Sequence, residues 1–118
     1  MSSLFKNLDA NVTMLHSKTS KEDLEFYVRH ADIVISCVGK RNLLKAEWFK
    51  ENSIIIGVGF TYDEKGKQHL DFEVDEVIEL GKVKAVTNRI NCTGKATVIS
   101  LMVNTVKAFL DNIQTEDK

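Results

Sequence analysis

The chain has 118 residues, 43% of them hydrophobic and 28% charged, with a formal net charge of −1. This length and composition predict one globular domain over residues 1–118, with a single hydrophobic core. The near-neutral charge excludes a general electrostatic attraction to nucleic acid, and no apolar run reaches the roughly 20 residues of a membrane-spanning helix.

The first half of the chain predicts helices that alternate with short strands. Residues 1–8 place apolar side chains on one helical face, whereas residues 11–15 (NVTML) are β-branched and short, as in a strand. Residues 20–23 (SKED) have the form of a capping box and predict that a helix begins there. Residues 32–38 (DIVISCV) are an almost continuous apolar run closed by Gly39, which indicates a buried parallel strand.

The second half continues this alternation. An apolar run that ends at Gly59 predicts another buried strand, and a polar stretch around Gly66 predicts a loop. The predicted elements are, in order, a short helix over residues 43–50, a strand over 53–58, a loop over 61–67, a helix over 72–80 ended by Gly81, and a strand over 83–87.

The carboxyl-terminal part predicts a long amphipathic helix from about Ala96, because apolar residues recur there at helical spacing. Its exposed face is expected to carry Ser100, Asn104, Lys107 and Asp111. The residues expected to be buried are Val98, Ile99, Met102, Val106, Phe109, Leu110 and Ile113.

Alternating strands and helices indicate an α/β fold of the Rossmann-like type, a three-layer α/β/α arrangement whose parallel sheet is covered on both faces. Because the first residues predict a helix, we expect this dinucleotide-binding domain to be partial, without the usual first strand and its glycine-rich phosphate loop. A sheet without that strand has unpaired backbone edges. We therefore expect the sheet to close with three or four strands, or the chain to dimerise across the gap.

Three residues at the end of the first predicted strand are candidates for cofactor binding. His16, Ser17 and Lys18 lie just before a predicted helix start, where an acidic residue selects NAD and a basic one accommodates the 2′-phosphate of NADP. No acidic residue is present, and Ser17, Lys18 and the first amides of the helix suit an anion. The alternative is an ordinary helix cap beside a solvated lysine.

Other candidates lie where strands end or helices begin. Gly39 and Gly59 each close a predicted strand, either because the turn needs a positive φ or because the backbone approaches a cofactor closely. Thr97 either caps the last helix or contacts the cofactor. Arg41 is expected to be solvated, and Lys95 either is solvated or contacts a phosphate or carboxylate.

The histidines and cysteines show no catalytic or metal-binding pattern. His30 is expected at a helix end and His69 in a loop, without a Cys, Ser or carboxylate at a spacing for nucleophilic catalysis or metal binding. Cys37 is expected to be inert inside a strand. The two cysteines therefore favour a reducing cytoplasm over a disulfide framework.

Residues 86–97 (VTNRINCTGKAT) join the last predicted strand to the last helix, a kind of junction at which ligand sites form in α/β sheets. With residues 97–108 (TVISLMVNTVKA), they resemble the end of the cofactor domain in the methylenetetrahydrofolate dehydrogenase/cyclohydrolase family. There the strand closes with Thr-Pro-Val-Pro-Gly-Gly-Val-Gly-Pro-Met-Thr, and the helix opens with Thr-Val and carries Asn-Thr-Val. Thr87, Gly94 and Thr97 match without a gap, every proline is replaced, and the resemblance covers nearly the whole chain.

The resemblance implies which positions bind the cofactor. A His-Ser-Lys-Thr turn, here residues 16–19, is typical of the family, and its Ser contacts the cofactor. The segments around Gly39 and Gly59 resemble those that line the nicotinamide and ribose. The candidate cofactor-binding residues are therefore His16, Ser17, Lys18, Gly39, Val58, Gly59, Phe60 and Thr97.

The resemblance also implies a function. Full-length members transfer a hydride from 5,10-methylenetetrahydrofolate to NADP and then hydrolyse the methenyl product, as oxidoreductases and hydrolases of one-carbon folate metabolism. Their amino-terminal domain supplies the catalytic Lys, a Tyr and most of the folate pocket, so we expect no catalytic residue here. The isolated chain is expected to be inactive, and to bind NADP in preference to NAD, but weakly or not at all.

The expected partners are NADP and the folate substrate in the full-length enzyme, together with either a second copy, as a homodimer, or the amino-terminal domain. The alternative function is a non-catalytic nucleotide- or anion-binding module, or an interaction module, descended from the cofactor domain. A titration with NADP distinguishes a retained cofactor role from this alternative.

Overall fold

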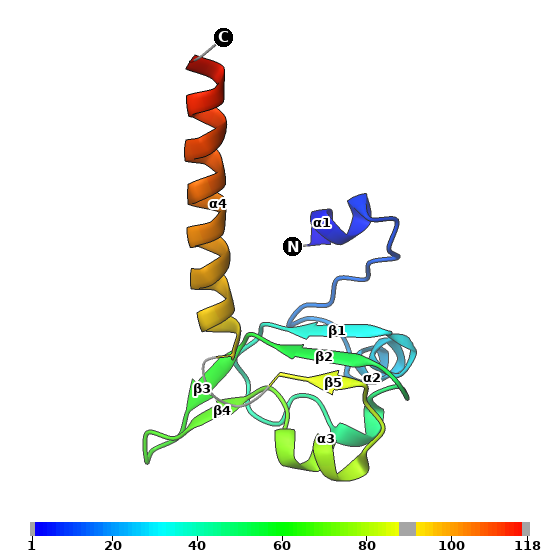
Figure 1. Ribbon diagram of the computed structural model, residues 1–118. Helices are drawn as coiled ribbons and strands as arrows, with labels where there is room; N and C mark the ends of the chain where they lie inside the picture. The colour runs from blue at the N-terminus through cyan, green and yellow to red at the C-terminus, as the bar shows by residue number, and fades with distance from the viewer. Residues whose placement is uncertain (1, 88–91, 117–118) are drawn as a thin grey trace.

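The computed structural model describes residues 2–87 and 92–116 of the chain (Figure 1). Short helices and strands alternate along the chain, and a long helix ends it. The elements are α1 (Ser2–Asn7), α2 (Lys21–His30), β1 (Ile33–Ser36), the 3-10 turn η1 (Ala46–Trp48), β2 (Ile54–Gly57), β3 (Phe60–Tyr62), β4 (Gln68–Leu70), α3 (Val74–Leu80), β5 (Ala85–Val86) and α4 (Cys92–Glu116).

The main sheet has three parallel strands in the order β1-β2-β5. Ile33 of β1 pairs with Ile54 of β2, which pairs in turn with Ala85 of β5. Strands β3 and β4 form a separate antiparallel hairpin. The parallel α/β architecture that the sequence predicts is confirmed. Of the three or four strands expected in the sheet, the described part of the chain has three.

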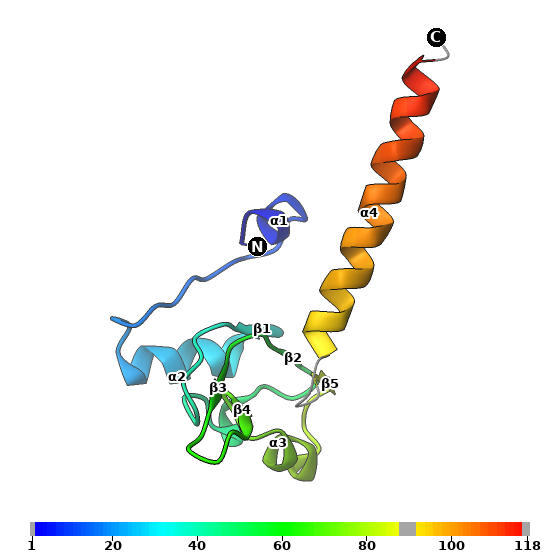
Figure 2. The same cartoon turned by 90° about the vertical axis from the view of Figure 1, so that its left-hand side faces the viewer.

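The core lies on one face of this sheet. Side chains alternate along the strands, so that Val34 and Ile55 are buried against α2, η1 and α3, on the side where α2 and α3 lie in Figure 2. Ile33 on the opposite face is 45% exposed, and Ile54 is half-buried. The apolar strands therefore have one packed face in this chain, whereas the sequence predicts burial on both.

Local signals in the sequence correctly predict the ends of two helices. The Ser20 hydroxyl accepts a hydrogen bond from the Asp23 amide at 3.1 Å, which caps α2 as the capping box predicts. Gly81 ends α3 in the left-handed conformation, with φ of 60°. Glycine adopts this conformation without steric cost, so the helix stops there.

Two predicted elements are wrong because their surroundings do not support them. Residues 11–15 form no strand, because their backbone pairs with neither of the described sheets. The side chains of Val12 and Met14 are exposed. Residues 43–50 contain only η1, because Leu44, Ala46 and Trp48 are buried alternately, and alternation suits an extended segment better than a helix.

The predicted polar loop over residues 61–67 is in fact part of a β-hairpin. Its first two residues belong to β3, residues 63–67 form the connection, and β4 follows directly. The Asp63 carboxylate accepts hydrogen bonds from the amides of Lys65 at 3.0 Å and Lys67 at 2.8 Å, while Gly66 adopts a φ of 75°. A polar stretch therefore became a hairpin because its own carboxylate binds the turn amides.

Helix α4 differs most from the prediction. It begins at Cys92, earlier than expected, and it extends away from the sheet in both views (Figures 1 and 2). All of the residues expected to be buried on it are between 41% and 64% exposed. The radius of gyration is 17.6 Å, whereas a compact chain of this length has a value of about 13–14 Å. The amphipathic period is present, but the described residues supply no surface that covers it.

No helix within residues 2–87 and 92–116 is both long and apolar enough to cross a membrane.

Candidate functional site

The segments that follow β1 and β2 lie against each other at the carboxyl ends of the strands. The Ser36 carbonyl accepts hydrogen bonds from the amides of Val58 at 2.8 Å and Gly59 at 2.9 Å. A Cβ atom at Gly59 would lie 2.5 Å from the Gly39 nitrogen and 2.7 Å from the Val38 nitrogen. Only glycine fits at position 59, because the neighbouring backbone occupies the space of a side chain.

Gly39 is required for a different reason. Its φ of 74° is in the left-handed region, and a Cβ atom there would also lie 3.1 Å from the Phe60 carbonyl oxygen. The positive φ expected of a glycine after a strand is confirmed at this position. At Gly59 the expected positive φ is wrong, because among the described glycines only Gly39, Gly66 and Gly81 have one. The close approach at Gly59 is to the protein's own turn. Approach of a cofactor to either glycine stays a prediction.

A buried carboxylate lies beneath this contact. Asp71 is fully buried and accepts hydrogen bonds from the Ser36 hydroxyl, from the Val38 amide at 3.0 Å and from the Lys40 amide at 2.7 Å. The reasoning from sequence missed this residue. The sequence did contain a signal for it, because Asp71 stands between the apolar residues Leu70 and Phe72. A charged residue that is buried with such neighbours needs hydrogen-bond partners.

The outer side of this edge is open and apolar. Val38, Val58 and Phe60 are exposed, and the Phe60 ring packs edge to face against Tyr62 with centroids 5.6 Å apart. Cys37 is exposed as well, which contradicts its predicted burial: it follows the end of β1 and therefore leaves the sheet. The structure thus brings four of the candidate residues, Gly39, Val58, Gly59 and Phe60, to one surface.

The other candidates lie in two further places. The turn at residues 16–19 is held by hydrogen bonds from the His16 amide to Thr19 Oγ1 at 3.0 Å and from the Lys18 amide to His16 Nδ1 at 3.1 Å. Ser17 and Lys18 are exposed in it, directly before α2. Thr97 is an exposed residue of α4.

The junction before α4 is described only in part. Thr87 follows β5, and its Oγ1 accepts a hydrogen bond from the Gly57 amide at 2.8 Å, which joins the ends of β5 and β2. Residues 88–91, which carry most of the replaced prolines of the resembling loop, lie outside the described residues. Lys95 is exposed on α4, and its proposed contact with an anion stays a prediction.

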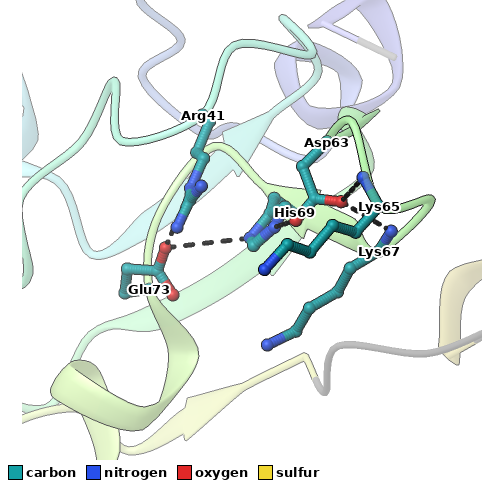
Figure 3. A network of polar contacts seen from close by, with 6 residues as sticks. All are labelled: Arg41, Asp63, Lys65, Lys67, His69 and Glu73. Atoms are coloured by element: carbon teal, nitrogen blue, oxygen red, sulfur yellow. Dashed lines mark hydrogen bonds and ion pairs between the residues drawn. The ribbon is translucent and has the colours of Figure 1, made fainter.

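His69 belongs to a polar network and not to a loop, contrary to the prediction (Figure 3). It lies in β4, is 7% exposed, and its Nε2 is 2.9 Å from Asp63 Oδ2. Its Nδ1 is 4.0 Å from Glu73 Oε1, and Arg41 Nε is 3.5 Å from the same oxygen. Arg41 is therefore paired, not simply solvated. Formation of the hairpin brings Asp63 and His69 together, which sequence spacing does not reveal.

This network predicts a stability that depends on pH. The hydrogen bond from His69, followed by that from the Lys67 amide, lowers the pKa of the Asp63 carboxyl from its ordinary value. A carboxyl whose pKa is lower in the folded state stabilises the protein above its unfolded pKa of about 3.9 and loses that effect as the pH falls. We expect Asp63→Asn to reduce the free energy of unfolding at pH 6, and to reduce it by progressively less as the pH falls toward 3. Urea denaturation of both proteins between these values, with Glu64→Gln as the control, measures the effect; a constant difference across the range contradicts the assignment.

Within the described ranges, no group of three or more His, Cys, Asp or Glu side chains is arranged to hold a metal ion.

A parallel sheet whose neighbouring strands end in two contacting glycine segments defines the class of Rossmann-like nucleotide-binding domains. Within that class, the chain belongs to the family of the tetrahydrofolate dehydrogenase/cyclohydrolase NAD(P)-binding domain, whose family model matches residues 1–113. The family resemblance inferred from the sequence is confirmed.

Individual relatives agree with this assignment. The bifunctional protein FolD of Methanoculleus marisnigri is 40% identical over 108 residues, which are 92% of this chain and 37% of the relative. FolD of Lactococcus lactis subsp. lactis is 37% identical over the same shares of the two chains. The chain therefore spans little more than a third of the curated relatives it matches.

Solved structures show the same relationship. The bifunctional methylenetetrahydrofolate dehydrogenase/cyclohydrolase FolD of Campylobacter jejuni superposes with a TM-score of 0.83 at 34% identity, over 95% of this chain and 38% of that one. FolD of Trypanosoma brucei, solved in complex with NADP cofactor and inhibitor, gives a TM-score of 0.82 at 30% identity, over 95% and 39% of the two chains.

Proposed function

We propose that this chain is the NADP-binding part of a 5,10-methylenetetrahydrofolate dehydrogenase/5,10-methenyltetrahydrofolate cyclohydrolase of one-carbon folate metabolism. The observation that carries the proposal is the contact of Gly39 with Gly59 at the strand ends of a domain from this family. Glycines at such an edge leave backbone groups accessible, and cofactors of Rossmann-like domains bind outside the carboxyl ends of the strands. The exposed thiol of Cys37 suits a reducing cytoplasm.

The residues fit the two ends of the cofactor in different ways. The backbone around Gly39 and Gly59, with the side chains of Val58 and Phe60, offers an open apolar edge for the nicotinamide and its ribose. The turn at residues 16–19 offers a hydroxyl and an ammonium group for the adenosine half. When bound, the nicotinamide accepts the hydride; the proposed role of this chain is to hold and orient it, and no side chain here is assigned to catalysis.

Lys18 is the residue we expect to favour NADP over NAD. The first turn of α2 already contains Glu22 and Asp23, whose charges oppose an anion there. A 2′-phosphate at this helix start therefore depends on the ammonium group of Lys18, since a hydrogen bond to a charged group contributes about 1.5–3 kcal/mol.

We expect Lys18→Ala to weaken NADP binding about tenfold, a loss of about 1.4 kcal/mol, and to leave NAD binding unchanged. Calorimetric or NMR titration of the 118-residue chain with both cofactors measures this. Lys107→Ala, at an exposed position on α4, is the matched control. Equal losses for NADP and NAD contradict the role of Lys18. Absence of saturable binding up to millimolar concentration contradicts a retained cofactor site and favours the non-catalytic interaction module.

The apolar face of α4 is the observation that bears on partners. We propose that it is covered in the working protein, either by the part of the enzyme that this chain does not span or by a second copy. Side chains such as Leu101, Met102 and Phe109 are each more than 60% exposed, and a contiguous apolar surface of this kind marks an interaction site. The greater length of the relatives supports coverage by the part of the enzyme that this chain does not span.

A further inference from the structure

The buried carboxylate of Asp71 has no part in the proposed cofactor contacts, although it touches both segments that make them. A buried charge is costly unless hydrogen bonds compensate it. All three of its hydrogen bonds described above come from residues 36–40. One carboxylate therefore organises a single turn of the backbone.

The geometry of that turn is specific. The two amide donors, Val38 and Lys40, lie on either side of Gly39, whose φ is 74°. They bind the two different oxygens of one carboxylate, Val38 at Oδ2 and Lys40 at Oδ1, and successive backbone amides in such a turn form an anion-binding concavity, called a nest. Here the anion is the protein's own Asp71, which selects the conformation in which both amides point inward.

Asp71 also reaches the second segment. Its Oδ2 would be 2.8 Å from a Cβ atom at Gly59, the glycine that contacts Gly39. The carboxylate itself is firmly placed, because Leu70 and Phe72 are buried on both sides of it and its carbonyl accepts a hydrogen bond from the Leu44 amide at 3.0 Å. A rigid position under both glycines allows one residue to set the relative arrangement of both segments.

We propose that Asp71 is a positioning residue for the cofactor: it holds residues 38–40 and 58–60 in the arrangement that binds NADP. This inference rests on the proposed function. Asparagine has nearly the same shape but only one acceptor oxygen. Its side-chain NH2 group must therefore face the backbone N–H of either Val38 or Lys40, and two donors that face each other form no hydrogen bond. Asp71→Asn therefore removes the positioning while it conserves the volume.

The test compares Asp71→Asn with Ser53→Ala in the 118-residue chain. Ser53 is 1% exposed at the amino end of β2, and its hydroxyl donates to the Lys50 carbonyl at 2.6 Å. Both changes disturb a hydrogen bond of a buried side chain, but only Asp71→Asn acts at the carboxyl ends of the strands. We expect the Kd for NADP to rise at least tenfold in Asp71→Asn and to stay within twofold of the parent value in Ser53→Ala, under conditions in which urea denaturation shows both to be folded.

A spectroscopic signature separates positioning from general destabilisation. In amide NMR spectra of Asp71→Asn, the Val38 and Lys40 amide protons are expected to shift upfield and to exchange faster with solvent, while Val77 in α3 stays unchanged. In the parent chain, saturating NADP is expected to slow exchange at the same two amides, since binding selects the positioned conformation. This second measurement needs no variant and decides the matter if Asp71→Asn does not fold.

The outcomes are distinct. If the parent chain binds NADP and Asp71→Asn binds it equally well, the positioning role is overturned and the proposed function stands. If NADP leaves exchange at Val38 and Lys40 unchanged, the positioning role is likewise overturned. If the parent chain shows no saturable response to NADP, the proposed function is contradicted and the role of Asp71 in cofactor binding falls with it.

Discussion

Gly59→Ala is expected to destabilise the protein by about 3 kcal/mol or more, at the upper end of what overpacking costs. The added methyl group would lie 2.5 Å from the Gly39 nitrogen, 2.7 Å from the Val38 nitrogen and 2.8 Å from Asp71 Oδ2. Two of these atoms belong to the backbone and the third to a fully buried side chain, so none can move aside as a flexible surface group does. Relief of the clash requires the segments after β1 and β2 to separate, which breaks the proposed site as well as the packing.

Chemical denaturation measures this effect, with Gly94→Ala as the matched control. A Cβ atom at Gly94 meets no atom within 4 Å, and alanine favours a helix over glycine by roughly 0.5–1 kcal/mol. The control is therefore expected to be neutral or slightly stabilising. A cost below about 1 kcal/mol for Gly59→Ala would show that the two glycine segments do not touch in solution.

Ile55→Ala is expected to reduce the free energy of unfolding by about 3–4 kcal/mol, whereas Ile99→Ala is expected to change it by less than about 0.5 kcal/mol. Ile55 is 0% exposed in the central strand β2, and its removal leaves a cavity between the sheet, α2 and α3. Ile99 is 61% exposed on α4, so its truncation removes few contacts. The same chemical change therefore separates the packed core from the unpacked helix.

The comparison is made by urea denaturation at two protein concentrations tenfold apart. A loss for Ile99→Ala that matches that for Ile55→Ala and is independent of concentration would mean that α4 packs on its own chain, against the structure. A loss that grows with concentration would mean that a second copy covers α4, and would favour the homodimer over pairing with the rest of a longer enzyme.

Local sequence signals are sufficient for the helices α2 and α3. The Ser20 hydroxyl accepts a hydrogen bond from the Asp23 amide at the start of α2, and Gly81 ends α3 by its own backbone freedom. The apolar runs that became β1 and β2 are likewise recognisable, because three successive β-branched residues followed by a small one fit a strand. The family was recognisable for the same reason: its residues match in order along nearly the whole chain.

Distant contacts decide the site residues that the sequence did not reveal. Asp71 is 31 to 35 residues away from the groups it binds, and the pairing of His69 with Asp63 exists only when the hairpin forms. The positive φ of Gly39 was predicted correctly, whereas Gly59 is required because the backbone of residues 38–39 occupies the space of a side chain there. Cofactor binding at either glycine stays a prediction. The spacing of residues along the chain does not reveal a contact between Gly59 and the backbone of residues 38–39.

By itself, the sequence determined the alternation of elements, the helix caps, the parallel α/β class and the family. The tertiary structure alone decided that residues 11–15 are not a strand, that one face of the sheet is packed, and that the apolar face of α4 is exposed. Periodicity specifies which side chains share a face, because it follows from backbone geometry. Burial of that face depends on whether another surface lies against it, and strand pairing depends on a neighbouring backbone, so neither follows from the segment's own residues.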